Sequence, residues 1–296
     1  MVVDLEKGSS MKYFLMFALI ISSFVALASN KVLYGDDNRT DVYASENPLW
    51  RELALSTAAM IQTQDLRSSD RDGFLDLNGP SLESRGMCSS ERFLSQPTAA
   101  FCSGFLVGED LLVTAGHCIR SVSDCDKFRW VFDYKMEDEE NINLEIPKEN
   151  VFKCVEVVSR ALNSWGDKND YALVRLDRAV EGRPVLKYRK KTDVAPEEGD
   201  HLVVIGHPTG LPTKIADGAA IRKLMSPVYL TANLDTYGGN SGSAVFNAES
   251  GVVEGILVRG ETDYVYENSC RVSKQCSDTG CRGEDVTRIT VIPELE

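Results

Sequence analysis

The chain has 296 residues, of which 43% are hydrophobic and 26% are charged, and its formal net charge is −13. This length provides for one large or two small globular domains, and this composition excludes a chain that is disordered throughout. The balance of 32 Lys and Arg against 45 Asp and Glu argues against nucleic-acid binding, because contacts to phosphate need a surplus of cations. The same balance gives the chain no attraction to an anionic membrane surface.

The first readable segment is an apolar run at 13–27 that follows Lys12 and is closed by Ala-Leu-Ala at 26–28. A basic start, an apolar middle and small residues at the end are typical of a secretory signal peptide. We therefore predict that residues 1–28 are a signal peptide and that the protein is secreted, to an extracellular or periplasmic space. The alternative, a stable membrane anchor, is disfavoured because a span needs about 20 apolar residues.

All eight cysteines lie after residue 28, and an even number in an exported chain predicts a disulfide framework. The low number of histidines, three, and the lack of any C-x-x-C pair argue against zinc, so neither a metal nor a cofactor is expected. The acidic run at 136–140 is interpreted as a solvated turn, because it lacks the ligand spacing of a calcium loop.

Residues 29–49 are polar and rich in turn formers, which predicts an N-terminal arm or a short propeptide. Residues 67–97 are rich in Ser, Asp and Gly, which predicts a long loop insertion. Elsewhere, turn signals separate short runs rich in Val, Ile, Tyr, Phe and Trp. Such runs without intervening helices indicate a β-sandwich or a β-barrel. The predicted strands are 56–62, 101–107, 111–115, 129–134, 151–158, 171–176, 201–206, 243–246 and 252–258.

Three motifs follow one another in an informative order. LLVTAGHC places His117 at the end of a strand-like run, NDYALVRLD places Asp170 before another, and GGNSGSAVF places Ser241 in a Gly-rich turn. The order His, Asp, Ser is one of the known chain orders of the hydrolytic triad. A serine hydroxyl is a poor nucleophile, so an imidazole must take its proton and a carboxylate must orient the imidazole.

With CSGFLVGED before the histidine, these three blocks resemble those of the chymotrypsin-fold serine proteases. GEDVTRI at 283–289 is similar to the last barrel strand of that family, and the resemblance covers roughly residues 50–296. The resemblance implies an all-β fold of two six-stranded antiparallel β-barrels with the active site between them. It also implies a disulfide between Cys102 and Cys118, beside the histidine.

The same resemblance implies a role for each residue of the site. Ser241 would be the nucleophile, His117 the base and then the acid, and Asp170 the group that orients His117. The backbone N–H groups of Gly239 and Ser241 would form the oxyanion hole, and glycine before the serine suits that geometry.

Several positions depart from the digestive-type members of the family. Asn240 stands where trypsin-like zymogens have the aspartate that pairs with a freed N-terminal amine, and Tyr237 stands where they have a cysteine. The GGNSGS form and GHPTG at 206–210 are similar to the bacterial branch of glutamyl endopeptidases. Cleavage after Lys31 would expose Val32 as a mature N-terminus, but Asn240 removes the usual reason for such an activation step.

Two readings of the specificity pocket remain open. Asp235 lies six residues before Ser241, and the family pattern places it at the base of the pocket, where a carboxylate would favour Lys or Arg before the scissile bond. Alternatively, Thr236 and Arg259 would bind the carboxylate of a Glu substrate. The first reading is preferred.

The remaining cysteines are only partly assigned by the sequence. Cys125 and Cys154 flank a predicted hairpin and are candidates to pair. The other four, Cys88, Cys270, Cys276 and Cys281, allow three pairings.

The sequence thus predicts a secreted serine endopeptidase that acts on proteins or peptides through an acyl-enzyme. The second hypothesis is a non-catalytic, protease-like binding module, for which the cysteine-rich loop and the 67–97 insertion are the support. An esterase of the α/β-hydrolase type is disfavoured, because its triad runs in the order Ser, Asp, His.

Overall fold

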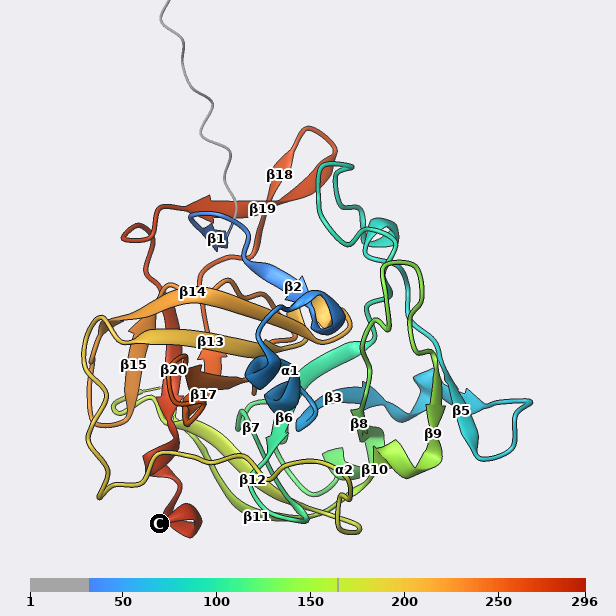
Figure 1. Ribbon diagram of the computed structural model, residues 1–296, viewed down its shortest axis with the longest axis horizontal. Coiled ribbons are helices and arrows are strands. Elements are labelled where there is room, and N and C mark those ends of the chain that lie inside the picture. The colour runs from blue at the N-terminus through green and yellow to red at the C-terminus, as the bar shows by residue number, and fades with distance from the viewer. Residues whose placement is uncertain (1–31, 164) are drawn as a thin grey trace, which may run out of the picture.

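The computed structural model of the chain describes residues 32–163 and 165–296, so the predicted signal peptide lies outside the described residues (Figure 1). The strands of the described part form two seven-stranded sheets and two three-stranded sheets. The only two α-helices in this part are α1 (Pro48–Ala54) and α2 (Asp124–Lys127). No helix among the described residues is both long and apolar enough to cross a membrane.

The first barrel is a curled antiparallel sheet with the order β10-β8-β3-β6-β7-β12-β11. Its edge strands β10 and β11 are consecutive parts of one chain segment, which pairs with β8 on one side and with β12 on the other. This segment therefore closes the ring, and large side chains such as Trp130 and Phe105 fill it. Its strands are β3 (Thr57–Gln62), β6 (Ala100–Leu106), β7 (Leu111–Thr114), β8 (Phe128–Phe132), β10 (Val151–Phe152), β11 (Cys154–Leu162) and β12 (Asp170–Leu176).

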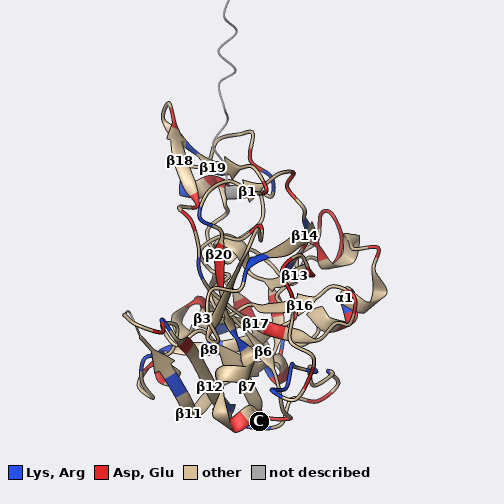
Figure 2. Cartoon of the chain, turned by 90° about the vertical axis from the view of Figure 1, so that its left-hand side faces the viewer, with Lys and Arg blue, Asp and Glu red and all other residues tan. Residues whose placement is uncertain are grey.

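The second barrel has the order β13-β16-β17-β20-β15-β14, and pairing between β13 and β14 closes it. In Figures 1 and 2 it lies above the first barrel. The predicted fold of two six-stranded antiparallel barrels is thus confirmed. The strands of this barrel are β13 (His201–Gly206), β14 (Lys214–Lys223), β15 (Tyr229–Ala232), β16 (Ala244–Asn247), β17 (Val253–Arg259) and β20 (Glu284–Arg288).

Two small sheets flank the barrels (Figures 1 and 2). One consists of β1 (Val32–Tyr34), β19 (Cys270–Cys276) and β18 (Tyr264–Glu267), and the other of β4 (Leu66–Ser68), β5 (Phe74–Leu77) and β9 (Glu145–Pro147). The predicted loop at 67–97 therefore contains a strand, because the apolar run of β5 pairs with β9 from a distant part of the chain. The 3-10 helices are η1 (Val42–Ala44), η2 (Thr63–Asp65), η3 (Glu83–Arg85), η4 (Lys148–Asn150), η5 (Pro208–Gly210), η6 (Ile289–Val291) and η7 (Pro293–Leu295).

Part of the predicted 29–49 segment is built into the second barrel. Its residues 32–41 are called the N-terminal arm from here on. Its strand β2 (Arg39–Asp41) pairs with β14 as a seventh strand. The Asp41 Oδ1 lies 2.5 Å from the Nζ of Lys214, whose side chain is 1% exposed. Arg39 is also buried, with its guanidinium 4.4 Å from the ring centre of Tyr237. Buried charges of this kind fix the arm in one position.

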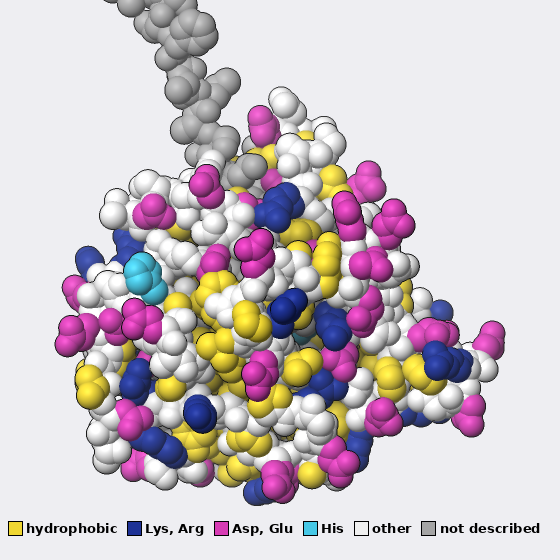
Figure 3. Space-filling view, in the orientation of Figure 1, with side chains coloured by type: hydrophobic (Ala, Val, Ile, Leu, Met, Phe, Trp, Pro, Cys, Tyr) yellow, Lys and Arg dark blue, Asp and Glu magenta, His cyan; other side chains and the backbone are white. Residues whose placement is uncertain are grey.

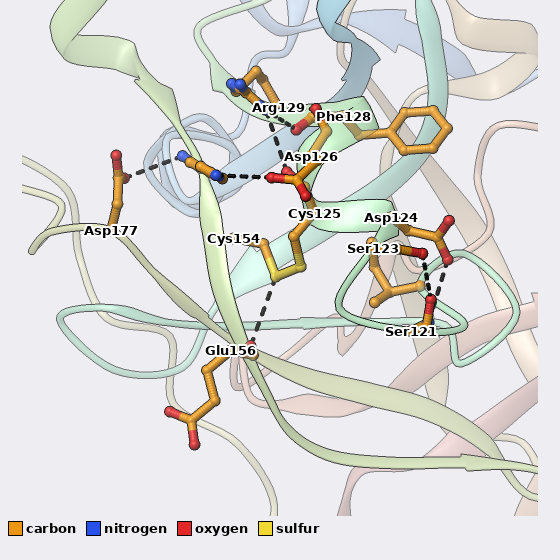
Figure 4. Close-up of a disulfide and its surroundings, with 12 residues drawn as sticks. Ser121, Ser123, Asp124, Cys125, Asp126, Phe128, Arg129, Cys154, Glu156 and Asp177 are labelled. Carbon is orange, nitrogen blue, oxygen red and sulfur yellow. Dashed lines mark hydrogen bonds and ion pairs between the residues drawn. A yellow bond between two sulfur atoms is a disulfide. The ribbon is translucent and has the colours of Figure 1, made fainter.

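The eight cysteines form four disulfides. Cys102 pairs with Cys118, and Cys125 pairs with Cys154, which ties α2 to β11. Figure 4 shows this second bridge with the neighbouring Asp126, whose carboxylate lies 2.8 Å from the Nζ of Lys153. The other two bridges, which the sequence left open, are Cys88–Cys270 and Cys276–Cys281.

The first prediction concerns the arm. Asp41→Ala leaves the Lys214 ammonium buried without its carboxylate partner, so we expect the free energy of unfolding to fall by about 3–5 kcal/mol. Burial already lowers the pKa of Lys214 to about 8. Urea unfolding measures the change. The control is Lys127→Ala, which breaks an exposed pair with Asp124 and is expected to cost less than about 1 kcal/mol. Equal decreases in the free energy of unfolding of the two variants would contradict a stabilising role for the buried Asp41–Lys214 pair.

Candidate active site

His117 and Asp170 meet where two paired strands end. Strand β7 ends at Thr114, which pairs with Ala172 of β12, so Asp170 at the start of β12 lies beside the residues that follow β7. The Asp170 Oδ2 is 2.9 Å from the His117 Nδ1, and its Oδ1 accepts the His117 backbone N–H at 3.1 Å. Asp170 is 2% exposed. The carboxylate therefore fixes the imidazole through Nδ1 and leaves Nε2 on the opposite side of the ring.

Ser241 belongs to the second barrel and lies in the serine loop (residues 235–243), which contacts the first barrel next to His117. Its carbonyl oxygen accepts the backbone N–H of Ser103 at 2.8 Å and lies 3.6 Å from the Sγ of Cys118, the residue after His117. Among the residues described, no hydrogen bond joins the His117 ring to the Ser241 hydroxyl. Such bonds are often long in active sites without substrate.

Two backbone N–H groups of the serine loop have no protein acceptor among the described residues. Gly239 has φ +97°, a conformation that favours glycine. The Gly238 carbonyl accepts the Thr209 N–H at 2.6 Å, and because a trans peptide points C=O and N–H in opposite directions, the Gly239 N–H faces away from Thr209. Within residues 32–163 and 165–296, neither Gly239 nor Ser241 donates its N–H to a protein acceptor. Both donors are thus free for an anion.

The GHPTG segment (206–210) packs against the serine loop at Gly238 and Gly239. A Cβ on Gly239 would lie 2.5 Å from the His207 carbonyl oxygen. The His207 side chain is fully buried, donates from Nδ1 to the Leu211 carbonyl oxygen at 3.0 Å, and has its pKa lowered to about 3 by burial. His207 therefore stays neutral and serves as structure. Ser243 is likewise buried, and its hydroxyl donates to the Asn240 Oδ1 at 3.1 Å, whereas Ser241 is half-buried.

A cavity of about 130 Å³ opens beside Ser241. Two carboxylates line it, those of Glu284 and Asp263, and neither belongs to the predicted specificity residues. The Glu284 Oε2 accepts the Thr236 hydroxyl at 2.9 Å, and its Oε1 accepts the Glu261 N–H at 3.1 Å. Glu284 begins a strand, a position typical of solvated acidic residues. Its partners Thr236 and Glu261 lie 48 and 23 residues away in the chain, so no local pattern indicates that this side chain is buried.

Asp235 does not line this cavity. Its Oδ1 accepts the N–H of Tyr34 at 2.8 Å, and its Oδ2 accepts the N–H of Asn38 at 3.1 Å. Both donors belong to the N-terminal arm. Asp235 is 4% exposed, and burial raises its pKa to about 7. The structure thus places Asp235 behind the pocket, where it binds the arm.

Arg259 and Thr236 do line the cavity, but their polar groups are already engaged. The Thr236 hydroxyl is bound to Glu284. The Arg259 guanidinium contacts the Asp285 carboxylate at 3.3 Å, the Lys168 carbonyl oxygen at 3.1 Å and the Asp170 Oδ2 at 3.6 Å. The Thr236 hydroxyl is thus donated to Glu284, and the positive charge of Arg259 is balanced by Asp285 and Asp170.

A metal site is not formed by the one cluster of suitable residue types in the described part of the chain. This cluster contains Cys102, His117 and Cys118, whose donor atoms lie within 4.8 Å of one another. Because both sulfurs belong to one disulfide, they are not available as thiolate ligands.

Comparison with known proteins identifies the family. The model of a trypsin-like peptidase domain matches residues 102–256, which is more than half of the 296-residue chain and contains His117, Asp170 and Ser241. The chain belongs to the trypsin-like peptidase family. A search of curated protein sequences finds no match.

Solved structures show the same fold at low sequence identity. The VesB protease of Vibrio cholerae is 14% identical, with a TM-score of 0.51, and the match covers 87% of this chain and 65% of that one. Human heparin binding protein is 12% identical, with a TM-score of 0.52 and coverage of 88% and 94%. A Glu endopeptidase is 15% identical, with a TM-score of 0.49 and coverage of 89% and 96%. At these identities the likeness concerns the fold alone.

The second prediction tests the close approach of the backbone at Gly239 in this trypsin-like peptidase. Gly239→Ala combines an unfavourable positive φ with a clash against the His207 carbonyl. We therefore expect the free energy of unfolding to fall by well above the roughly 1–2 kcal/mol that the positive φ alone would cost. Gly73→Ala is the matched control, because Gly73 has φ +83° but nothing within 4 Å of an added Cβ. Thermal unfolding compares them. Equal losses would show that the serine loop yields to the added methyl group.

Proposed function

We propose that this protein is a secreted serine endopeptidase with Ser241 as nucleophile, His117 as acid and base, and Asp170 as the group that orients His117. The observation that carries the proposal is the His117–Asp170 pair beside a serine whose loop presents two unpaired N–H groups. Acyl transfer needs a base for the serine proton and preorganised donors for the oxyanion. This set of groups matches both needs.

The reaction proceeds in two halves. The Ser241 Oγ attacks the scissile carbonyl carbon, its proton passes to the His117 Nε2, and the oxyanion binds the N–H groups of Gly239 and Ser241. His117 then gives this proton to the leaving nitrogen, the C–N bond breaks, and an ester remains on Ser241. Water attacks the ester with His117 again as base. The proton returns to the Ser241 Oγ as the carboxylic product leaves.

The substrate residue before the scissile bond is proposed to be Lys or Arg. The cavity beside Ser241 holds the carboxylates of Glu284 and Asp263, whereas its one guanidinium, that of Arg259, is already bound to Asp285 and Asp170. A cationic side chain would restore the balance of charge in this cavity. Glu284 thus takes the recognition role that the sequence pattern predicted for Asp235.

The proposed site of action is outside the cytoplasm. Four disulfides join all eight cysteines, which is typical of chains that fold in an oxidising compartment. The pattern at 1–28, which is typical of a signal peptide, also supports export. Basic and acidic side chains are interspersed on the face seen in Figure 3, without the basic stripe that a nucleic-acid partner would need. Proteins or peptides are the proposed partners.

The third prediction tests the nucleophile. Ser241→Ala removes the only proposed attacking atom, so we expect peptide hydrolysis to fall by at least about 10⁴-fold. The assay is cleavage of a mixed peptide library by protein starting at residue 29, with products identified by mass spectrometry. Ser250→Ala is the control, because Ser250 is exposed and lines neither cavity beside the serine loop. Full activity in Ser241→Ala would refute the proposal.

The fourth prediction tests the pocket. Glu284→Gln is expected to lower kcat/KM for Lys and Arg substrates by about 10- to 100-fold, because a charge-assisted contact is lost. Burial raises the pKa of Glu284 to about 8, with Asp263 nearby raising it and Arg282 lowering it. The ionised form binds a cation, so KM should fall as the pH rises from 7 to 9, and this trend should vanish in Glu284→Gln.

Asp235→Asn serves as the control for the pocket assignment. Since Asp235 faces the arm, this variant should keep the preference for Lys and Arg. Cleavage of the library after Glu residues, or loss of the preference in Asp235→Asn alone, would contradict the assignment to Glu284.

A further inference from the structure

A second, larger cavity of about 520 Å³ adjoins the serine loop on its other side. Gly238 and Asp263 line both this cavity and the smaller one beside Ser241, so the two cavities meet there. Gly239, which carries one of the free N–H groups, also lines the larger cavity. We call the larger cavity the leaving-side cavity, because it lies where the part of a substrate after the scissile bond would leave.

The position of β6 shows which part of a substrate this cavity would receive. His117 must protonate the leaving nitrogen, so the chain after the scissile bond departs on the side of the Cys102–Cys118 disulfide, next to His117. Phe101 directly precedes Cys102, is 57% exposed and lines the leaving-side cavity. The pairing of β3 with β6 passes from Cys102 to Ala100 and skips Phe101, which leaves its backbone available to an extended peptide.

The outer wall of the cavity is a built structure that joins distant parts of the chain. The Cys88–Cys270 disulfide links the 67–97 insertion to β19 across 182 residues. The Cys88 N–H donates to the Arg271 carbonyl oxygen, and the Arg271 N–H donates to the Gly86 carbonyl oxygen, each at 2.9 Å. Arg271 also donates from its side chain to the carbonyl oxygen of Arg85. The wall therefore holds two arginines side by side.

These two arginines offer positive charge and N–H donors to the cavity. Arg85 and Arg271 both line it, and neither forms an ion pair with a carboxylate of the described residues. Arg85 uses its Nε and Nη2 on the hydroxyl and carbonyl oxygens of Thr98, at 2.5 and 2.9 Å, and keeps its remaining N–H groups. Two carboxylates also line the cavity: Asp65, and Asp263, which accepts the Gly238 N–H at 2.7 Å and is shared with the smaller cavity beside Ser241.

We infer that the leaving-side cavity binds the part of a substrate that follows the scissile bond and selects an acidic side chain there through Arg85 and Arg271. A carboxylate offers two acceptor oxygens to the free guanidinium N–H groups, whereas a neutral or basic side chain does not. The inference rests on the proposed function, because a leaving portion exists only if the protein cleaves peptides.

The test compares substrates that share one acyl portion ending in Lys. One is an ester with a small leaving group, and the others are peptides with Glu, Gln or Lys at the second and third positions after the scissile bond. The readout is kcat/KM of each peptide divided by that of the ester. We expect the Glu peptide to exceed the Gln peptide by about tenfold and the Lys peptide to be the poorest.

The double variant Arg85→Gln with Arg271→Gln should bring the Glu-to-Gln ratio close to one. Arg67→Gln is the matched control, because Arg67 is exposed in β4 and does not line the cavity, and it should keep the preference. Equal cleavage of the Glu, Gln and Lys peptides by the native chain, or a preference that survives the double variant, overturns the inference while the endopeptidase proposal stands. Cleavage of neither ester nor peptides overturns the endopeptidase proposal itself, and this inference with it.

Discussion

The geometry of the site depends on Ser103, the residue at which the two barrels are joined. It lies in β6 of the first barrel and is completely buried. Its N–H donates to the Ser241 carbonyl, its hydroxyl donates to the Gly239 carbonyl, and the same hydroxyl accepts the His207 N–H. The histidine comes from one barrel and the serine from the other, so this contact sets their separation together with the hydrophobic core that the two barrels share. Thr114, at the end of the strand that leads to His117, donates in turn to the Ser103 carbonyl.

A second layer of buried polar groups lies behind the cavity beside Ser241. There the N-terminal arm supplies two backbone N–H groups to Asp235 and its Tyr34 hydroxyl, at 3.5 Å, to Glu284. Amide donors satisfy a buried carboxylate without adding a countercharge, and burial accordingly raises the pKa of both acids, to about 7 and about 8. The arm therefore supports the carboxylates at and behind this cavity, although none of its residues lines the cavity itself.

The features that the sequence made predictable are those coded within a short segment. The strand runs and the order of His117, Asp170 and Ser241 follow from local patterns. The two-barrel fold follows from the family resemblance that these segments carry, and the structure contains both barrels. The roles of Asp235 and Glu284 depend instead on partners far away in the chain: Tyr34 is 201 residues from Asp235. The Cys88–Cys270 bridge was equally out of reach, because only the folded insertion brings β19 beside it.

That bridge has a consequence for the lifetime of a molecule that cuts peptide chains. His117, Asp170 and Ser241 all lie between Cys88 and Cys270, inside one covalent loop. A single cut within this loop, whether by another protease or by a second copy of the chain, would separate no fragment, because the two pieces would stay joined through the sulfurs. The exposed turns between the barrels can thus be nicked while both halves of the site remain on one covalent molecule.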